Sequence, residues 1–243
     1  MTRVKICGIT RPDLALAAAE AGADFFGLVF YPPSHRNVTQ EQATAIVAAV
    51  RQAGLSTPSV GVFVNAPVSE MNRLAQAIPL DYVQLHGDEP WALIRLLERP
   101  AIKAVRLIGE KSTSRVAAEI ETGLKLIAGH DVTVMLDSQV PGMYGGTGLA
   151  LESDMVADLS RRFRILVAGG LTPQNVGQLV THARPWGVDV SGGVETYRVK
   201  DPDKIRAFIR AVRQADSGGV TVDPLDHRGR PVEPGGIIGS ESP

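Results

Sequence analysis

The chain has 243 residues, a net charge of −1, a hydrophobic fraction of 44% and a single cysteine. This length allows one large domain or two small ones with a substantial buried core. The near-neutral charge provides no general field for nucleic acid or an acidic membrane, so we expect neither as a partner. One cysteine excludes an internal disulfide, and no apolar run reaches the roughly 20 residues of a membrane span. We therefore expect a soluble, cytoplasmic protein.

Strands and helices are predicted to alternate along the chain. In the first strand Val4 and Ile6 alternate with Lys5 and Cys7, and Gly8 permits a tight turn after it. Apolar runs predict further strands at 25–30, 59–64, 82–86, 102–107, 132–137, 165–168 and 188–190. Helices are predicted at 14–22, 39–52, 69–77, 91–98, 112–122, 153–161, 172–183 and 201–214.

Three of these helices have start signals. Thr39 and Gln42 have the spacing of a capping box, in which each side chain bonds the other residue's backbone N–H. Thr172-Pro173-Gln174-Asn175 supplies a cap and a proline at the first helical position, and Asp201-Pro202 opens the last helix in the same way.

Eight strand and helix pairs within residues 1–215 predict an α/β fold, a single (β/α)8 TIM barrel with eight parallel strands. The strand sequences support closure. Residues two apart point to the same face of a strand, so polar pairs at this spacing are expected to face a lumen while apolar residues meet the helices. The pairs are Lys5 with Cys7, Gln84 with His86, and Asp189 with Ser191.

The composition changes from Asp216 onwards, where no helical or alternating pattern continues. So little apolar area cannot offset the entropy of ordering this segment, and we expect a disordered Gly/Pro-rich tail over residues 216–243. Val220, Val222 and Ile237-Ile238 leave docking against the barrel as the alternative.

Polar residues and glycines follow several of the predicted strands. The carboxyl ends of the strands form the active face of a TIM barrel, so these residues are the candidate site. They are Cys7, Arg36, His86, Asp137, Gly169-Gly170 and Ser191-Gly192-Gly193.

The two glycine pairs come after consecutive strands, seven and eight. A single pair is more often a tight turn, but this fold commonly holds a phosphate on main-chain N–H groups at both places together. We infer a phosphorylated small-molecule substrate, held by Gly169, Gly170, Ser191, Gly192 and Gly193.

Cys7 and Asp137 are the candidate base and acid. A lone cysteine is more often a buried small hydrophobe, but Lys5 shares its face of the strand and its charge would favour the thiolate. A carboxylate such as Asp137 after three apolar residues could also be a cap or loop residue. Strands one and six lie three apart in a ring of eight, so a sugar-sized substrate could lie between the two groups.

His86 and Arg36 have weaker signals. His86 could titrate near neutrality, although hydrogen bonding that supports a loop is the favoured role. Arg36 could be an ordinary solvated charge, but in a proline-stiffened loop it is a reasonable carboxylate clamp. No metal-ligand spacing and no dinucleotide fingerprint is present in the sequence.

An ordered series of motifs resembles the phosphoribosylanthranilate isomerase family of tryptophan biosynthesis, over about residues 4–211. The matching motifs are K-I-C-G-I-T at 5–10, G-L-V-F-Y-P-P-S-H-R at 27–36, V-G-V-F-V-N at 60–65, V-Q-L-H-G-D-E at 83–89, L-D-S at 136–138, Y-G-G-T-G at 144–148, A-G-G-L-T-P-Q-N-V at 168–176 and V-D-V-S-G-G-V-E at 188–195.

The resemblance implies a cofactor-free Amadori rearrangement of N-(5-phosphoribosyl)anthranilate to 1-(2-carboxyphenylamino)-1-deoxyribulose 5-phosphate. It implies Asp137 as general acid, Cys7 as general base and Arg36 on the anthranilate carboxylate. We also expect His86 and Asp189 among the substrate-binding residues. This chemistry needs a protonated carboxyl group and a thiolate at once, so we expect a lowered pKa for Cys7. We expect a monomer or a homodimer.

Three departures from the family pattern stand out. Leu151-Glu152-Ser153 replaces the usual Phe-Asp-Trp, although Ser153 could itself be an N-cap, and Gly192 stands where a second serine is common. The tail has no counterpart in the family. The rival interpretations are another phosphosugar isomerase, epimerase or synthase, and a barrel that binds a phosphorylated ligand without converting it.

Overall fold

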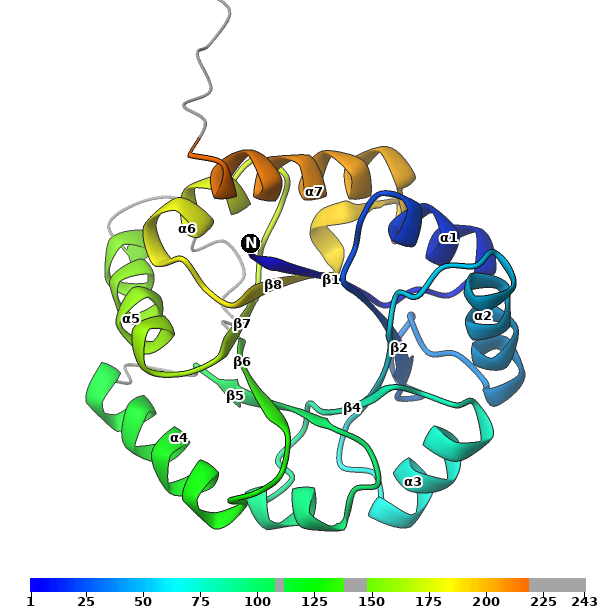
Figure 1. The fold of residues 1–243 in the computed structure, drawn as a ribbon, viewed down its shortest axis with the longest axis horizontal. Helices are drawn as coiled ribbons and strands as arrows, with labels where there is room; N and C mark the ends of the chain where they lie inside the picture. Colours follow the sequence, from blue (N-terminus) through cyan, green and yellow to red (C-terminus); the bar gives the residue numbers. More distant parts are fainter. Residues whose placement is uncertain (108–111, 138–147, 219–243) are drawn as a thin grey trace, which may run out of the picture.

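The structure is a computed structural model that describes residues 1–107, 112–137 and 148–218. Eight parallel strands close into a barrel in chain order, and the helices surround it (Figure 1). The ring closes where β1 pairs with β8 as well as with β2. The predicted TIM barrel is therefore confirmed. The strands are β1 (Arg3–Cys7), β2 (Phe25–Phe30), β3 (Ser59–Phe63), β4 (Tyr82–Leu85), β5 (Ala101–Arg106), β6 (Val132–Asp137), β7 (Ile165–Ala168) and β8 (Gly187–Val190).

The helices begin and end close to most of the predicted positions. Two predicted caps are present: Thr39 and Gln42 form a capping box, and the Asp201 carboxylate accepts from two backbone N–H groups. The α-helices are α1 (Pro12–Glu20), α2 (Gln40–Gln52), α3 (Val68–Ala77), α4 (Thr113–Leu126), α5 (Gly148–Arg162), α6 (Val176–Ala183) and α7 (Pro202–Asp216). The shorter elements are the 3₁₀ helices η1 (Trp91–Leu96) and η2 (Gly192–Val194), and the strands β9 (Glu195–Thr196) and β10 (Val199–Lys200).

Three local predictions were wrong. The helix predicted at 91–98 is the shorter 3₁₀ helix η1, which ends at Leu96. α5 begins at Gly148, so Ser153 lies within the helix and is not its N-cap. α6 begins only at Val176. Parts of three predictions lie outside the described residues. They are Ser138 of the L-D-S motif, residues 144–147 of the Y-G-G-T-G motif, and the tail at 219–243.

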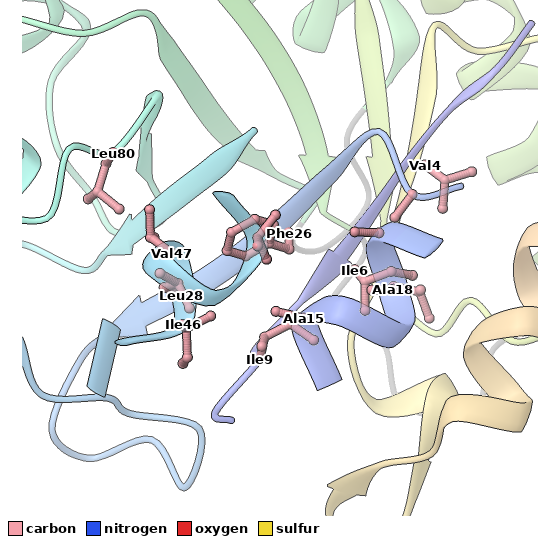
Figure 2. Close-up of a cluster of buried hydrophobic side chains, with 14 of the residues drawn as sticks. Val4, Ile6, Ile9, Ala15, Ala18, Phe26, Leu28, Ile46, Val47 and Leu80 are labelled. Carbon is pink, nitrogen blue, oxygen red and sulfur yellow. The ribbon is translucent and has the colours of Figure 1, made fainter. Parts of the chain in front are cut away.

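Side chains alternate between the two faces of β1, as predicted. Val4 and Ile6 are fully buried against helices, in a cluster to which β2, α1 and α2 also contribute (Figure 2). Cys7 faces the lumen, where it packs in a second cluster with residues such as Met135 and Leu166. The period of two in a strand therefore separates the helix-facing core from the lumen that carries the candidate site.

Aromatic rings fill the amino end of the lumen. Phe25 and Tyr82 meet edge to face with ring centroids 5.4 Å apart, and Trp186 lies 5.9 Å from Phe25. Because rings occupy this end, a ligand has access to the lumen from the carboxyl ends of the strands.

The two ends of the barrel segment are tied together at the same face. The Asp216 carboxylate accepts from the Thr2 backbone N–H at 2.8 Å and from its hydroxyl at 2.7 Å. Asp216 was predicted to begin the tail, but it is the last residue of α7 and belongs to the barrel. In the part of the chain that the structure describes, no helix has both the length and the apolar character needed to cross a membrane.

Candidate functional site

A cavity of about 690 Å³ opens at the carboxyl ends of the strands. This volume is within the usual range for small-molecule sites. All of the candidate residues predicted from the sequence line it: Cys7, Arg36, His86, Asp137, Gly169, Gly170, Asp189, Ser191, Gly192 and Gly193.

The order of the strands fixes how the candidate groups surround the cavity. Going round the ring from β6 to β1, the strands are β6, β7, β8 and β1. Asp137 ends β6 and Cys7 ends β1, while the glycine pairs follow the two strands between them. A ligand anchored at the glycine turns therefore has a carboxyl group on one flank and a thiol on the other.

Cys7 lies beside a buried ion pair. The Lys5 ammonium is fully buried and donates to Asp189 Oδ1 at 2.8 Å across the β1–β8 pairing. A Cβ placed on Gly27 would lie 3.0 Å from Cys7 Sγ and 3.1 Å from Lys5 Nζ, so the thiol and the ammonium converge on this glycine of β2. The small residue at position 27 makes room for both groups.

The environment of Cys7 differs from the prediction. Burial raises the pKa of the Cys7 thiol, and although the Lys5 ammonium lowers it, the Asp189 carboxylate raises it again. The cation expected to favour the thiolate is thus balanced by its own carboxylate partner, and desolvation decides the sign. The expectation of a lowered pKa for Cys7 was wrong for the free protein.

Asp137 is held next to His86 at the ends of β6 and β4. His86 Nε2 lies 3.3 Å from Asp137 Oδ2, and its other ring nitrogen lies 3.1 Å from the Gln84 amide nitrogen. The His86 ring was expected to support a loop, and in the structure it contacts the candidate acid instead. Gln84 is almost fully buried and also contacts Met135, so the ring is fixed from the lumen side.

The two glycine turns are pressed together. Gly169 and Gly170 have φ angles of 101° and 59°, which side chains rarely adopt. A Cβ on Gly193 would lie only 1.8 Å from the backbone oxygen of Leu171, so the two turns touch through their main chains. Asn175 was predicted only as part of a helix cap, but its side chain accepts from the Thr172 N–H and donates to the Gly170 carbonyl. It therefore fixes the turn after β7.

Arg36 has a protein partner that was not predicted. Its guanidinium donates from Nε and Nη2 to the two oxygens of Glu195 at 2.7 and 2.8 Å. The same carboxylate contacts the ammonium of Lys200, which is almost fully buried. Glu195 was noted only as the last letter of a motif, and Lys200 gave no signal because only the β9–β10 hairpin brings it there.

A metal site finds no support in the part of the chain that is described. No group of three or more His, Cys, Asp or Glu side chains within it could hold a metal ion. The arrangement brings a carboxyl group, Asp137, and a thiol, Cys7, to one cavity, and such a pair is suited to acid–base chemistry.

Comparison with known proteins matches this chain to one family. The family model of N-(5'-phosphoribosyl)anthranilate (PRA) isomerase matches residues 4–211. The enzyme of that name from Roseiflexus sp. (strain RS-1) is 44% identical over 220 residues, covering 88% of this chain and 99% of the relative. The one from Pseudomonas putida (strain KT2440) is 46% identical over 215 residues, covering 88% of this chain and 98% of the relative.

Solved structures agree. The phosphoribosyl anthranilate isomerase of Thermotoga maritima superposes with a TM-score of 0.72 at 36% identity, covering 88% of this chain and 99% of that one. A further solved isomerase of this kind, in complex with reduced 1-(o-carboxyphenylamino)-1-deoxyribulose 5-phosphate, has a TM-score of 0.73 at 34% identity, with the same coverage.

Proposed function

Because the chain belongs to the N-(5'-phosphoribosyl)anthranilate isomerase family, we propose that it converts N-(5-phosphoribosyl)anthranilate to 1-(2-carboxyphenylamino)-1-deoxyribulose 5-phosphate. The reaction is an Amadori rearrangement, in which C2 of the sugar is oxidised and C1 reduced. Electrons balance within the substrate, so the chemistry itself calls for acid and base but for no external oxidant.

One observation carries the proposal: the ring places two glycine turns between Asp137 and Cys7. A phosphate held by the main-chain N–H groups of these turns would tether the 5' end of the ribose. The sugar would then extend between the acid on β6 and the base on β1. Anchoring at a distance from the reacting atoms supplies the positioning that a small reacting centre lacks.

Asp137 is the proposed general acid. It would protonate the ring oxygen of the ribose, so that the C1–O bond breaks and the anthranilate nitrogen forms a protonated Schiff base with C1. His86, whose Nε2 lies 3.3 Å from Asp137 Oδ2, would orient the carboxyl group toward the ring oxygen. The carboxyl side chain is about one-tenth exposed, which limits competition from water.

Cys7 is the proposed general base. Its thiolate would remove the proton from C2 of the Schiff base to give an enolamine, which tautomerises to the ketone. Burial raises the pKa of the thiol in the free enzyme, so the thiol form prevails before substrate binds. A cationic Schiff base beside Cys7 would favour loss of the thiol proton, and ring opening by the acid therefore prepares the base.

Arg36 is the proposed contact for the anthranilate carboxylate. A guanidinium can bind a planar carboxylate through two parallel N–H groups, which gives orientation as well as affinity. Arg36 lines the cavity together with Ser34 and Tyr31 of the same loop, so the aromatic ring would lie toward this side of the opening.

The direct test is turnover of freshly made phosphoribosylanthranilate, followed by loss of its fluorescence. We expect catalysed loss with the wild type and a rate lowered by about 10³-fold with Cys7→Ala. A wild type that binds the substrate without consuming it would favour the non-enzymatic barrel, and conversion of other phosphosugars alone would favour a different isomerase.

We place this activity in tryptophan biosynthesis, in the cytoplasm, as a monomer or a homodimer. Rescue of a tryptophan auxotroph lacking this step, by the wild type but not by Cys7→Ala, tests the pathway. Light scattering of the purified protein decides between the two assemblies.

A further inference from the structure

Arg36, Glu195 and Lys200 form a charged cluster at the rim of the cavity, in which one carboxylate lies between two cations. Glu195 binds Arg36 through both oxygens, at 2.7 and 2.8 Å, and contacts Lys200 through Oε1. The side chains of Glu195 and Lys200 are 8% and 1% exposed, whereas that of Arg36 is 25% exposed. The anion and one cation are thus fixed inside the protein, and only Arg36 reaches the opening.

The hairpin after β8 holds this cluster rigidly. Lys200 pairs with Glu195 in the β9–β10 ladder, across a turn in which Tyr197 and Arg198 have positive φ angles of 50° and 65°. Lys204 of α7 also donates to the Glu195 carbonyl at 2.7 Å. Glu195 therefore has little freedom to follow Arg36 if the arginine moves.

The contact with Glu195 fixes which edge of Arg36 is available. Glu195 occupies the edge formed by Nε and Nη2, which leaves the edge formed by Nη1 and Nη2 for a second carboxylate. The aliphatic part of the side chain is confined as well, because a Cβ on Gly8 would lie 2.4 Å from Arg36 Cδ. The guanidinium is thus held at both its stem and its head.

We propose that Glu195 is a positioning residue that makes the enzyme selective for carboxylated substrates, by aiming the outer edge of Arg36 at the aromatic carboxylate. Lys200 keeps Glu195 in place and compensates its charge, so that the three groups together carry a net positive charge toward the ligand. The inference rests on the proposed function, because Arg36 is the contact for the anthranilate carboxylate there.

Two opposing effects follow from neutralising Glu195. Loss of the anion increases the positive charge that faces the substrate carboxylate, which by itself would strengthen binding. It also leaves Arg36 and Lys200 as like charges separated by a neutral amide. Because Lys200 is buried and Arg36 is the more exposed of the two, Arg36 is expected to turn toward solvent, so the loss of orientation dominates.

The test compares Glu195→Gln with the wild type on two substrates, phosphoribosylanthranilate and the analogue N-(5-phosphoribosyl)aniline, which lacks the carboxylate. We expect KM for the carboxylated substrate to rise about tenfold, equivalent to about 1.4 kcal/mol, with kcat changed by less than about twofold. KM for the aniline analogue should stay the same. A purely structural defect would change both substrates equally.

Glu70→Gln is the matched control. Glu70 binds Arg73 through both oxygens at 2.8 Å, the same chemistry as the Glu195 pair, but on the exposed surface of α3. This variant should behave as the wild type on both substrates. The double variant Glu195→Gln/Lys200→Met removes the repelling cation as well, and we expect it to recover part of the lost discrimination between the two substrates.

Three results would overturn the inference: a fall in KM for the carboxylated substrate in Glu195→Gln, an equal loss on both substrates, or no change. In each case an active wild type leaves the proposed function standing. A wild type that does not convert phosphoribosylanthranilate would instead refute the proposed function itself.

Discussion

Each end of the barrel carries a carboxylate bound to two cations, Asp24 at the amino end and Glu195 at the carboxyl end. Asp24 accepts from Arg3 at 2.6 Å and from Arg213 at 3.0 Å, and also from the Val4 N–H at 2.8 Å. Glu195 accepts from Arg36 and Lys200. The two clusters have the same chemistry, so their roles must differ through what else their cations contact.

The second contacts separate the two ends. Arg213 also donates to the backbone carbonyls of Thr2 and Gly22, at 2.6 and 3.0 Å, so its N–H groups join the last helix to the start of the chain. Arg36 instead lines the cavity. The amino-end cluster therefore stabilises the closed ring, whereas the carboxyl-end cluster holds Arg36 at the cavity, in line with the general separation of stability and activity between the two ends of this fold.

The largest effect that would test this division is expected at Cys7 and Asp137, the proposed proton-transfer groups. Cys7→Ala and Asp137→Asn should each lower kcat by about 10³-fold, because general acid–base catalysis typically contributes 10²–10⁴. Stability in urea should change by less than about 1 kcal/mol, since neither change buries a new charge. Both variants should still bind reduced 1-(o-carboxyphenylamino)-1-deoxyribulose 5-phosphate, and fluorescence measures this binding. If both variants failed to fold, the roles of Cys7 and Asp137 would remain unsupported.

Lys5→Met should show that the carboxyl end also contributes to stability. The change leaves Asp189 as a buried carboxylate without its cation, and we expect a loss of about 3 kcal/mol in the free energy of unfolding. It also removes the cation that lowers the pKa of Cys7 most, ahead of Lys200, so kcat should fall too. Urea denaturation and steady-state kinetics measure the two effects. The double variant Lys5→Met/Asp189→Asn should regain part of the stability, and its failure to do so would contradict the ion-pair argument.

Asp24→Ala should affect stability alone. Three donors lose their acceptor, and we expect the free energy of unfolding to fall by about 2 kcal/mol. The kcat/KM of the folded variant should equal that of the wild type, because Asp24 lies at the end of the barrel opposite the cavity. Asp13→Ala is the control, since Asp13 pairs with Arg11 at the exposed surface and should contribute little. A marked loss of activity in Asp24→Ala would break the proposed division.

The smallest effect concerns acid pH. Burial alone would raise the pKa of Glu195, but hydrogen bonds from Arg36 and Lys200 lower it from 4.5 to about 2. Bonds from Arg3, the Val4 N–H and Arg213 likewise outweigh burial and lower the pKa of Asp24.

A lowered native pKa contributes stability that is fully present above the unfolded pKa and is lost as pH falls through the native one. Thermal unfolding measured between about pH 5 and about pH 2 should show the wild-type stability declining as the pH falls. The decline should be shallower in Glu195→Gln and in Asp24→Asn. An identical decline in all three proteins would contradict these assignments.

The part of the fold that depends on local patterns could be predicted from the sequence. The alternation of Val4 and Ile6 with Lys5 and Cys7 correctly predicted which side chains of β1 face the helices and which face the lumen. This alternation follows directly from the backbone geometry of a strand. Consecutive strand and helix units then fix the order in the ring, so candidate residues at strand ends were correctly expected to meet around one cavity.

Predictions failed where a contact joins distant parts of the chain. Lys5 and Asp189 are 184 residues apart, and only the closed ring shows that the carboxylate offsets the charge expected to ionise Cys7. Arg36 and Glu195 are 159 residues apart, and neither residue type indicates the pairing. One local prediction also failed. Asn175 was expected to help cap a helix, but its side chain bonds the turn before the helix and not the helix itself.

The hydrogen bonds between Thr2 and Asp216 bring the first strand and the last helix within contact distance at the amino end. A short peptide joining these positions would need to cross little space, so the barrel is a candidate for circular permutation. New termini opened after α2, at the exposed Gly54, would leave every cavity-lining residue in its strand or turn.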